Sequence, residues 1–451
     1  MPEPTPDYAT STAGALAAAL AARTVSSVEL FDAAVQRIEQ LDGPINAVVV
    51  RDFDRAHDAA KAADAALARG ERHRLLGVPM TVKEAHNVAG LPTTWGIESF
   101  RDWIAPADST GVARLKAAGA VIVGKTNVPP NLADWQSANP VYGRTNNPRD
   151  LARSPGGSSG GSAAALAAGM VPLEFGSDIG GSIRVPAAFC GVYGHKPSYE
   201  LIPQRGHAPP GFDGASIALN VVGPMARSAG DLALALDVLA GPDGEDVKGY
   251  RVVLPAPRHT RLADYRVLVL GDHPLAAVEE DISAALEQLA VQLGRAGARV
   301  SRQSDLLPDL AAAHGVYLTL LLTAMSRGAP PAANLIDAHA WLNALDAQLS
   351  FRRRWATQFE TFDVVLAPVL GVVAFEHTTA EWPERQFTIN GRQTAFGDQL
   401  VWPGMATLAN LPATSVPIGA DSRGLPIGVQ VIGPYLEDRS TIAFAGLIAG
   451  L

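Results

Sequence analysis

Short apolar segments alternate with amphipathic helical segments along most of the chain, and this alternation constrains the fold more than any other feature. Residues 75–82 (Leu-Leu-Gly-Val-Pro-Met-Thr-Val) and 120–123 (Ala-Val-Ile-Val) are almost free of polar side chains, and a helix is expected between them at 109–119. Strands that are buried on both faces have this composition. The same pattern predicts strands at 265–270 and 364–367 and a helix at 278–294. The chain is therefore expected to be an α/β protein with a largely buried sheet.

The first 70 residues are expected to be mostly helical. Ser26 and Glu29 have the spacing of a capping box, in which each side chain bonds the backbone N–H of the other residue at the start of a helix. Gly43-Pro44 is expected to end that helix, because proline cannot continue the hydrogen-bond ladder. The other elements expected in this part are helices at 13–22 and 54–68 and a strand at 45–50. We predict an N-terminal helical segment, 1–70, that packs on an α/β domain formed by 71–451, the two making one structural domain.

The charge balance excludes several classes of partner. The chain has 451 residues, with 36 Lys and Arg against 45 Asp and Glu and a formal net charge of −9. Proteins that bind nucleic acid or an anionic membrane surface are usually basic, so neither partner is expected. An apolar run at 316–325 is too short to span a bilayer, and the Ala-rich segment at 13–22 follows acidic residues instead of the basic ones that begin a signal peptide. We therefore expect a cytoplasmic protein.

The single cysteine and the lack of a Cys, His and carboxylate cluster with metal-binding spacing argue against a metal centre. A single cysteine, Cys190, excludes an internal disulfide and a multi-cysteine metal site. A phosphate-binding P-loop is also excluded, because no Lys-Ser or Lys-Thr pair follows the glycine-rich stretch that ends at Gly161. We expect no metal and no cofactor, and we expect Cys190 to be a buried packing residue.

Two glycine- and serine-rich loops are the most unusual part of the sequence. They span 156–162 and 176–186 and flank a short Ala-rich helix expected at 163–169. Glycines let successive backbone N–H groups face an anion, and neighbouring serines are candidates for a nucleophile or a proton carrier. A single loop of this kind is most simply explained as a tight turn. Two such loops within apolar sequence favour a catalytic or binding site. An α/β-hydrolase elbow fits 156–160 formally, yet residues 150–155 before it cannot form the required buried strand.

These loops resemble the signature of the amidase signature family. The matching stretches are Gly156-Gly-Ser-Ser-Gly-Gly-Ser162 and Gly176-Ser-Asp-Ile-Gly-Gly-Ser-Ile-Arg-Val-Pro186. Further matches lie, in the order of the family, at 77–84, 124–127, 189–191, 196–198, 223–228, 362–368, 410–417 and 424–430. The resemblance extends from about residue 11 to the C-terminus. It implies a single large α/β domain with a central mixed β-sheet covered by helices on both faces.

The resemblance also implies a Ser–cis-Ser–Lys triad. By position, Ser182 is the nucleophile, Ser158 is the bridging serine in a cis peptide with Gly157, and Lys83 is the base. A serine hydroxyl is a poor nucleophile until a base takes its proton, and none of the ten histidines lies in a comparable motif. A lysine accepts a proton only when it is neutral. Burial after the apolar strand at 75–82 is expected to lower the pKa of Lys83 and thereby to increase its neutral fraction.

The loop that leads to Ser182 is implied to form the oxyanion hole. The donors implied by the resemblance are the backbone N–H groups of Ile179, Gly180, Gly181 and Ser182. Asp178 and Arg184 are expected to form an ion pair that holds this loop in place, and Asp178 has no partner residues nearby for binding a metal. Ser177 stands where the family more often has threonine, a change that keeps the hydroxyl.

The implied activity is hydrolysis of C–N bonds in small amides or carbamates (urethanes), and also of esters, through an acyl- or carbamoyl-serine intermediate. The pattern is most similar to the bacterial aryl-amidase and urethanase members. Two alternatives stay open: the glutaminase subunit of a tRNA-dependent amidotransferase, which has the same fold, and a binding homologue without activity. The expected partner is a small-molecule substrate only, and the chain is expected to be a monomer or a homodimer.

Substrate contacts are the feature that the sequence determines least, because family specificity lies in loops outside the signature. By analogy, the candidate loops are 201–220 and 371–400, and an apolar wall is expected from 317–341, through Tyr317, Leu318, Leu321 and Trp341. The individual residues predicted to bind substrate are Gln204, Arg205, His207 and Tyr142.

Overall fold

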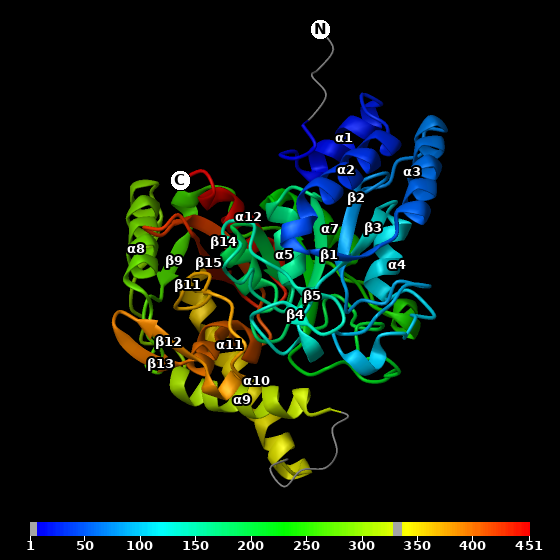
Figure 1. Cartoon of the computed structure of the whole chain (residues 1–451). Helices are drawn as coiled ribbons and strands as arrows, with labels where there is room; N and C mark the ends of the chain where they lie inside the picture. The colour runs from blue at the N-terminus through cyan, green and yellow to red at the C-terminus, as the bar shows by residue number, and fades with distance from the viewer. Residues whose placement is uncertain (1–6, 328–335) are drawn as a thin grey trace.

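The structure, a computed structural model, describes residues 7–327 and 336–451. Within these ranges, an 11-stranded mixed sheet forms the centre of the molecule (Figure 1). Its strands, in spatial order, are β1 (Val48–Arg51), β3 (Val121–Thr126), β2 (Pro79–Lys83), β6 (Leu173–Asp178), β8 (Val221–Ala226), β7 (Tyr193–Lys196), β14 (Ala413–Ala420), β15 (Pro426–Ile432), β11 (Val364–Pro368), β9 (Arg266–Val269) and β10 (Arg299–Ser301). Two small antiparallel sheets lie outside it, one of β4 (Ala138–Asn139) and β5 (Gly143–Arg144), the other of β12 (Gln386–Ile389) and β13 (Arg392–Ala395).

Helices cover both faces of the central sheet. Apolar clusters join the strands to one set of helices on one face and to another set on the opposite face. On one face these are α1 (Ala13–Ala22), α4 (Thr110–Ala117), α7 (Ala229–Leu239), α8 (Glu280–Arg295) and α12 (Asp438–Ile448), and on the other α5 (Gly160–Ala167), α6 (Arg184–Cys190), α10 (Ala338–Thr361) and α11 (Val401–Leu408). The remaining α-helices are α2 (Ser27–Ile45) and α3 (Phe53–Ala68) near the β1 edge and α9 (Leu310–Met325) beside α10. This arrangement confirms the predicted α/β fold.

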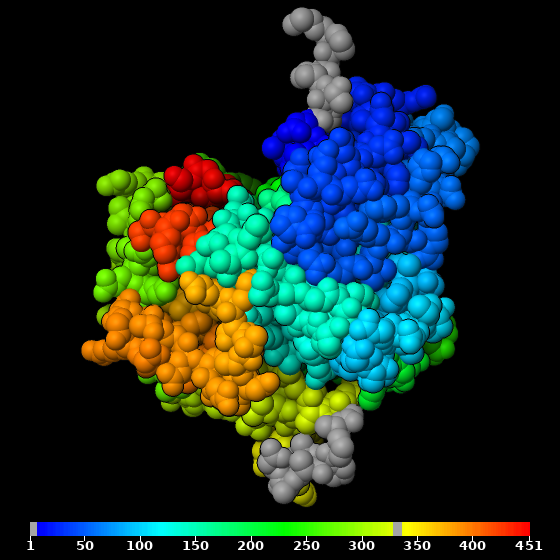
Figure 2. Space-filling model, viewed as in Figure 1, coloured from blue at the N-terminus to red at the C-terminus, as the bar shows by residue number. Residues whose placement is uncertain are grey.

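Residues 7–70 include a strand of the central sheet as well as helices that pack on it. Strand β1 pairs antiparallel with β3, and the space-filling view shows this segment (blue) in continuous contact with the chain that follows it (Figure 2). The predicted capping box is present: the Ser26 Oγ accepts the Glu29 N–H at 3.1 Å, and the Glu29 carboxylate accepts the Ser26 N–H at 2.7 Å.

The predicted end of α2 at Gly43-Pro44 is wrong, because the helix continues to Ile45. Pro44 lies in the last turn, where its missing N–H removes a single hydrogen bond and does not break the helix. The helix ends instead at Asn46, which adopts a left-handed conformation (φ 58°) and donates its N–H to the Asp42 carbonyl at 2.6 Å.

The order of the central strands places the predicted base, Lys83, next to the second glycine- and serine-rich loop. Strand β2 pairs parallel with β6, with Val82 opposite Phe175. Since parallel strands end at the same edge, Lys83 at the end of β2 lies beside Ser177 near the end of β6.

Among the residues that the structure describes, no helix is long and apolar enough to cross a membrane.

Candidate active site

Lys83 is fully buried and its amino group contacts two serines. The Nζ donates to the Ser158 Oγ at 2.6 Å and to the Ser177 Oγ at 2.9 Å. Burial lowers the pKa of Lys83 to about 7, although the carboxylates of Asp178 and Glu174 act in the opposite direction. A substantial fraction of this lysine is therefore neutral near pH 7 and able to accept a proton.

Ser158 lies in the first glycine-serine loop, directly before α5. The Gly157–Ser158 peptide bond is cis. A side chain at position 157 would meet the Asp134 carbonyl oxygen at 2.3 Å, so the backbone passes too close to its neighbour for any residue but glycine. The Ser159 N–H donates to the Ser182 carbonyl at 3.1 Å, and this bond ties the two serine loops together.

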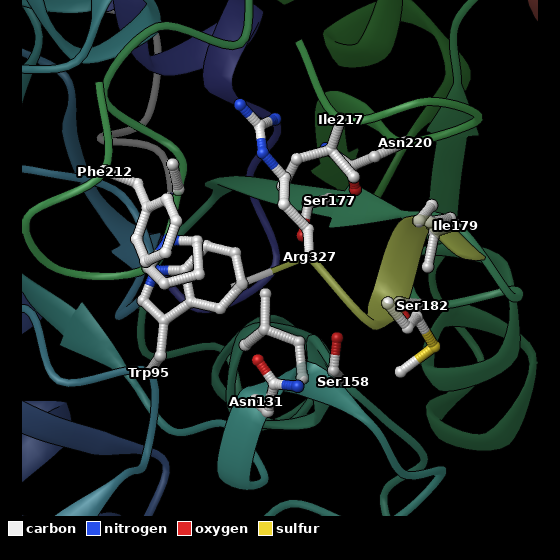
Figure 3. Close-up of a pocket in the computed structure, with 15 residues that line it drawn as sticks. Trp95, Asn131, Ser158, Ser177, Ile179, Ser182, Phe212, Ile217, Asn220 and Arg327 are labelled. Carbon is white, nitrogen blue, oxygen red and sulfur yellow. The ribbon is translucent and has the colours of Figure 1, made fainter. Parts of the chain in front are cut away.

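Ser182 lies in the turn between β6 and α6 and lines a pocket together with Ser158 and Ser177. The residue before it, Gly181, has φ 93°, a conformation that favours glycine. The Ser182 Oγ forms no hydrogen bond with any residue that the structure describes, so its hydroxyl is free to face a ligand in the pocket (Figure 3). Among the described residues, no hydrogen bond joins the Ser158 and Ser182 hydroxyls, although both side chains line the same pocket.

The predicted oxyanion donors divide into three free groups and one occupied group. The N–H groups of Ile179, Gly180 and Ser182 have no acceptor among the described residues. The Gly181 N–H instead donates to the Asp178 carboxylate at 2.9 Å, which corrects its predicted role as an oxyanion donor. A carboxylate is a stronger acceptor than a neutral carbonyl and holds this N–H away from the pocket.

Two aromatic side chains fix the direction of the peptide groups in this loop. The Ile179 carbonyl accepts the Tyr317 hydroxyl at 2.9 Å, and the Gly180 carbonyl accepts the Trp135 indole N–H at 2.9 Å. Because the C=O and N–H of a trans peptide point in opposite directions, these contacts also set where the next N–H points. Tyr317, predicted as part of an apolar wall, is thus a support of the loop that leads to Ser182.

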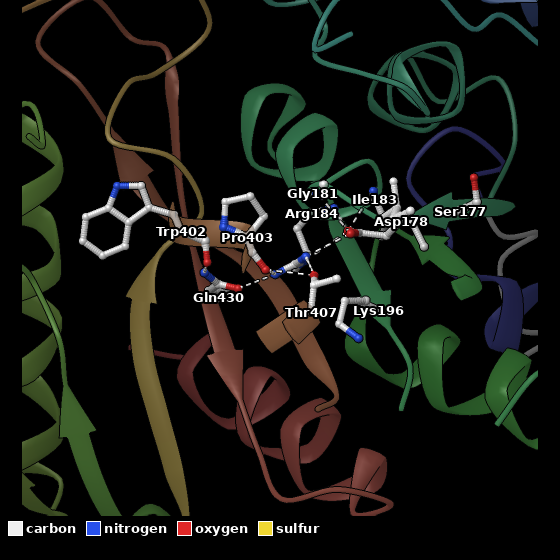
Figure 4. A network of polar contacts seen from close by, with 12 residues as sticks. Ser177, Asp178, Gly181, Ile183, Arg184, Lys196, Trp402, Pro403, Thr407 and Gln430 are labelled. Carbon is white, nitrogen blue, oxygen red and sulfur yellow. Dashed lines mark hydrogen bonds and ion pairs between the residues drawn. The ribbon is translucent and has the colours of Figure 1, made fainter. Parts of the chain in front are cut away.

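Asp178 and Arg184 form the predicted pair across the same loop. Both side chains are fully buried, and Arg184 donates to Asp178 through Nε at 3.0 Å and Nη2 at 2.9 Å. Burial raises the pKa of the Asp178 carboxyl, but the Arg184 charge and hydrogen bonds outweigh it and bring the pKa down to about 2. Arg184 also donates to Gln430 Oε1 at 2.7 Å and Thr407 Oγ1 at 2.9 Å, which links the loop to β15 and α11 (Figure 4).

The pocket above the serines is lined mostly by apolar atoms. Trp95 and Phe212 lie on one side of it, and Ile179 and Ser182 lie on the opposite side (Figure 3). Among its described lining residues there is no carboxylate and one cation, Arg327, whose Nη1 donates to the Ala215 carbonyl at 2.5 Å. The other lining residues are Asn131, Leu132, Ala208, Pro209, Ile217, Asn220, Ala324 and Met325.

None of the four residues predicted to bind substrate lines this pocket. Gln204 is buried and donates to the Asn220 carbonyl at 2.8 Å, and Arg205 forms an ion pair with Asp243 at 2.7 Å outside the pocket. His207 is buried against the ring of Trp95, with centroids 5.2 Å apart, and the Tyr142 hydroxyl donates to Glu84 at 3.1 Å.

Of the two segments predicted to shape the pocket, one lines it. Segment 201–220 contributes Ala208, Phe212 and Asn220 to the lining, whereas 371–400 contributes nothing to it. Leu318, Leu321 and Trp341 pack in an apolar cluster between α9 and α10, and the end of α9 reaches the pocket instead. Trp95 is not among the predicted residues; its position directly before Gly96, in a Pro-Thr-Thr-Trp-Gly turn, is the signal that could have identified it.

Cys190 is buried and its thiol donates to the Pro155 carbonyl at 3.4 Å. Burial raises the pKa of this thiol, which disfavours the reactive thiolate. In the described ranges, no group of three or more His, Cys, Asp or Glu side chains is arranged to hold a metal ion.

Comparison with known proteins identifies the family. The family model for amidases matches residues 29–329 and 318–442. A glutamyl-tRNA(Gln) amidotransferase subunit of Anaeromyxobacter sp. (strain K) is 36% identical over 473 residues, covering 94% of this chain and 92% of that protein.

Solved structures agree with this assignment. An inhibitor-bound structure of a vestigial protein complex, which bears on the origins of an s-triazine catabolic enzyme, matches with a TM-score of 0.85 and 29% identity and covers 98% of both chains. A bacterial aryl acylamidase of the amidase signature family matches with a TM-score of 0.81 and 25% identity, covering 98% of this chain and 96% of that one. The chain therefore belongs to the amidase signature family and is a hydrolase of C–N bonds.

Proposed function

We propose that this enzyme hydrolyses small neutral amides and carbamates, with a preference for those that carry an aryl group, through a covalent intermediate on Ser182. The observation that carries the proposal is the 2.6 Å contact between the buried Lys83 Nζ and the Ser158 Oγ, at the base of the pocket that Ser182 also lines. A neutral lysine in this position can draw a proton from Ser158 as Ser158 takes one from Ser182.

The first half of the reaction forms the covalent intermediate. The Ser182 Oγ attacks the substrate carbonyl carbon, and its proton passes to Ser158 while the Ser158 proton passes to Lys83. The carbonyl oxygen gains the negative charge beneath the free N–H groups of Ile179, Gly180 and Ser182. When the C–N bond breaks, Ser158 gives its proton to the departing nitrogen and recovers one from Lys83, because an amine cannot leave as an amide anion.

The second half releases the product. Water replaces the amine, loses its proton through Ser158 to Lys83, and attacks the acyl carbon while the bond to Ser182 breaks. The Ser182 oxygen then takes back the proton. A carbamate carbonyl presents the same oxygen to the loop as an amide carbonyl, so this arrangement supports both classes of substrate.

The composition of the pocket supports neutral substrates. Its walls are mostly apolar, with two aromatic rings, and such walls favour apolar or aryl groups over charged ones. Free glutamine carries an α-ammonium group, and no carboxylate among the described lining residues is available to bind it.

A glutaminase role within a tRNA-dependent amidotransferase is the second candidate, because the 36% identity to an amidotransferase subunit extends over 94% of this chain. The test is one assay of the purified chain with acetanilide, phenyl carbamate, phenyl acetate and glutamine under identical conditions. We expect turnover of the aryl amide and the carbamate and negligible turnover of glutamine. Faster turnover of glutamine would favour the amidotransferase role, and an absence of both turnover and fluorophosphonate labelling would favour a binding protein.

A further inference from the structure

We propose that Trp95 selects substrates with a planar aryl group, and that the buried carboxylate of Glu84 positions Trp95 for this role. The inference rests on the proposed function of the pocket and names the feature that sets its substrate class. Trp95 lies on the wall opposite Ser182, beside Phe212 (Figure 3).

The backbone of Trp95 is held in an unusual conformation. Its φ is 54°, in the left-handed region that a bulky residue seldom adopts. Its indole N–H donates to the Ala85 carbonyl at 3.1 Å, which fixes the ring plane. A strained backbone of this kind persists only where surrounding contacts determine it, and such residues concentrate at ligand sites.

Glu84 supplies those contacts. It follows Lys83 directly, is fully buried, and accepts the N–H of Thr94 at 2.5 Å and the N–H of Trp95 at 3.0 Å on its two oxygens. The Tyr142 hydroxyl donates to the same carboxylate at 3.1 Å. One side chain thus holds two consecutive N–H groups and sets the turn from which the Trp95 ring projects.

A second buried charge holds the same turn from its other end. Lys125 is fully buried, and its Nζ donates to the Thr93 Oγ1 at 2.7 Å and to the Pro92 carbonyl. Burying a charge is unfavourable unless hydrogen bonds compensate for the lost water. Here a carboxylate and an ammonium group direct their hydrogen bonds to one short segment, 92–95, and this concentration on a pocket wall points to a role in substrate binding.

Ring stacking gives the wall its selectivity. The face of an indole attracts the edge or offset face of another aromatic ring, and a saturated ring of equal carbon number is thicker and lacks this attraction. An aryl group beside Trp95 is therefore favoured over a cyclohexyl group by about threefold to tenfold. The matched pairs that measure this are acetanilide against N-cyclohexylacetamide, and benzamide against cyclohexanecarboxamide.

The first test is Trp95→Leu. We expect the ratio of kcat/KM for the aryl member to that for the cyclohexyl member to fall by about threefold to tenfold in at least one pair, mainly through a higher KM for the aryl member. Glu84→Gln should lower the same ratio, and the double variant should lower it no further than Trp95→Leu alone. Tyr142→Phe, which removes one hydrogen bond and leaves the charge, should lower it by a smaller factor.

Asp42→Asn is the matched control. Asp42 is also a buried carboxylate that accepts two consecutive N–H groups, those of Ala47 at 2.6 Å and Val48 at 3.2 Å, and it does not line the pocket. Its replacement should reduce stability and leave the ratio unchanged. An unchanged ratio in Trp95→Leu, with Ser182 still labelled by fluorophosphonate, would overturn the inference alone; failure of the wild-type enzyme to be labelled would overturn the proposed function as well.

Discussion

Arg184 binds Asp178 through two parallel hydrogen bonds, and neither side chain is exposed to solvent. The same carboxylate accepts the N–H groups of Gly181 and Ile183 on either side of Ser182. This pair therefore holds the nucleophile loop on both sides of Ser182.

We expect Asp178→Asn to lower the free energy of unfolding by about 3–5 kcal/mol, because it leaves the Arg184 charge buried without a counter-charge. Urea unfolding measures this loss. The control is Asp243→Asn, which breaks the ion pair with the well-exposed Arg205 and should cost about 1 kcal/mol or less. A loss below about 1 kcal/mol for Asp178→Asn would show that the pair does not hold the loop.

Ser182→Ala should abolish turnover of acetanilide, because the proposed covalent intermediate forms on the hydroxyl that this change removes. Mass spectrometry after treatment with a fluorophosphonate should find the adduct on Ser182 and on no other serine. Ser158→Ala should keep a small residual rate, since water can replace the bridging hydroxyl in part. An adduct on Ser158 in the wild-type enzyme would assign the nucleophile to the other loop.

Activity should depend on the protonation of Lys83. With its pKa lowered to about 7 by burial, the neutral form decreases below that pH, so kcat/KM should fall by about tenfold per pH unit on the acidic side and level off above it. Lys83→Ala should lose several orders of magnitude in rate at every pH. A full-rate Lys83→Ala enzyme would remove this residue from the mechanism.

Glu174→Gln should move this acidic limb to lower pH. The ionised Glu174 carboxylate raises the pKa of Lys83, so its removal leaves burial less opposed and lowers that pKa. Because burial raises the pKa of Glu174 itself to about 7, only part of this carboxyl is ionised near that pH, and the shift should be small. The pH profile of kcat/KM measures the shift. Glu279→Gln, which alters a partly buried carboxylate bonded to the Val373 N–H, should leave the profile in place. A shift toward higher pH in Glu174→Gln would contradict the sign of this interaction.

Tyr317→Phe should lower kcat by about fivefold and change KM little, because it removes one neutral hydrogen bond from the loop that stabilises the oxyanion. Steady-state kinetics with acetanilide separates the two parameters. Tyr265→Phe is the matched control, since the Tyr265 hydroxyl also donates to a backbone carbonyl, that of His259 at 3.0 Å, on a strand flank outside the pocket. Equal effects of the two variants on kcat would show that both act through a general loss of protein stability and not through the oxyanion loop.

EDTA treatment should not reduce activity, because the proposed mechanism uses only Lys83, two serines and backbone N–H groups. The rate with acetanilide before and after dialysis against EDTA checks this. Recovery of a lost rate by added zinc or magnesium would contradict the proposal.

The sequence predicts the fold and the two serine loops well because both depend on local signals. The all-apolar strand at 120–123 and the Ser26–Glu29 capping box are properties of a few neighbouring residues, and the structure contains both. The pocket walls depend on which side of a loop faces Ser182, and this is set by distant partners. Gln204 turns toward Asn220 and Arg205 turns toward Asp243, and neither contact can be recognised from local sequence.

The register of β2 on β6 has a consequence for how the enzyme can be altered. Because Val82 lies opposite Phe175 in paired parallel strands, Lys83 is anchored at the end of a fully buried strand of the central sheet. Part of the substrate wall belongs instead to a surface loop, 208–217, and to the end of α9. Grafting these two segments from related enzymes should therefore change the range of substrates. The contact between Lys83 and Ser158 and the lowered pKa of Lys83 should stay unchanged.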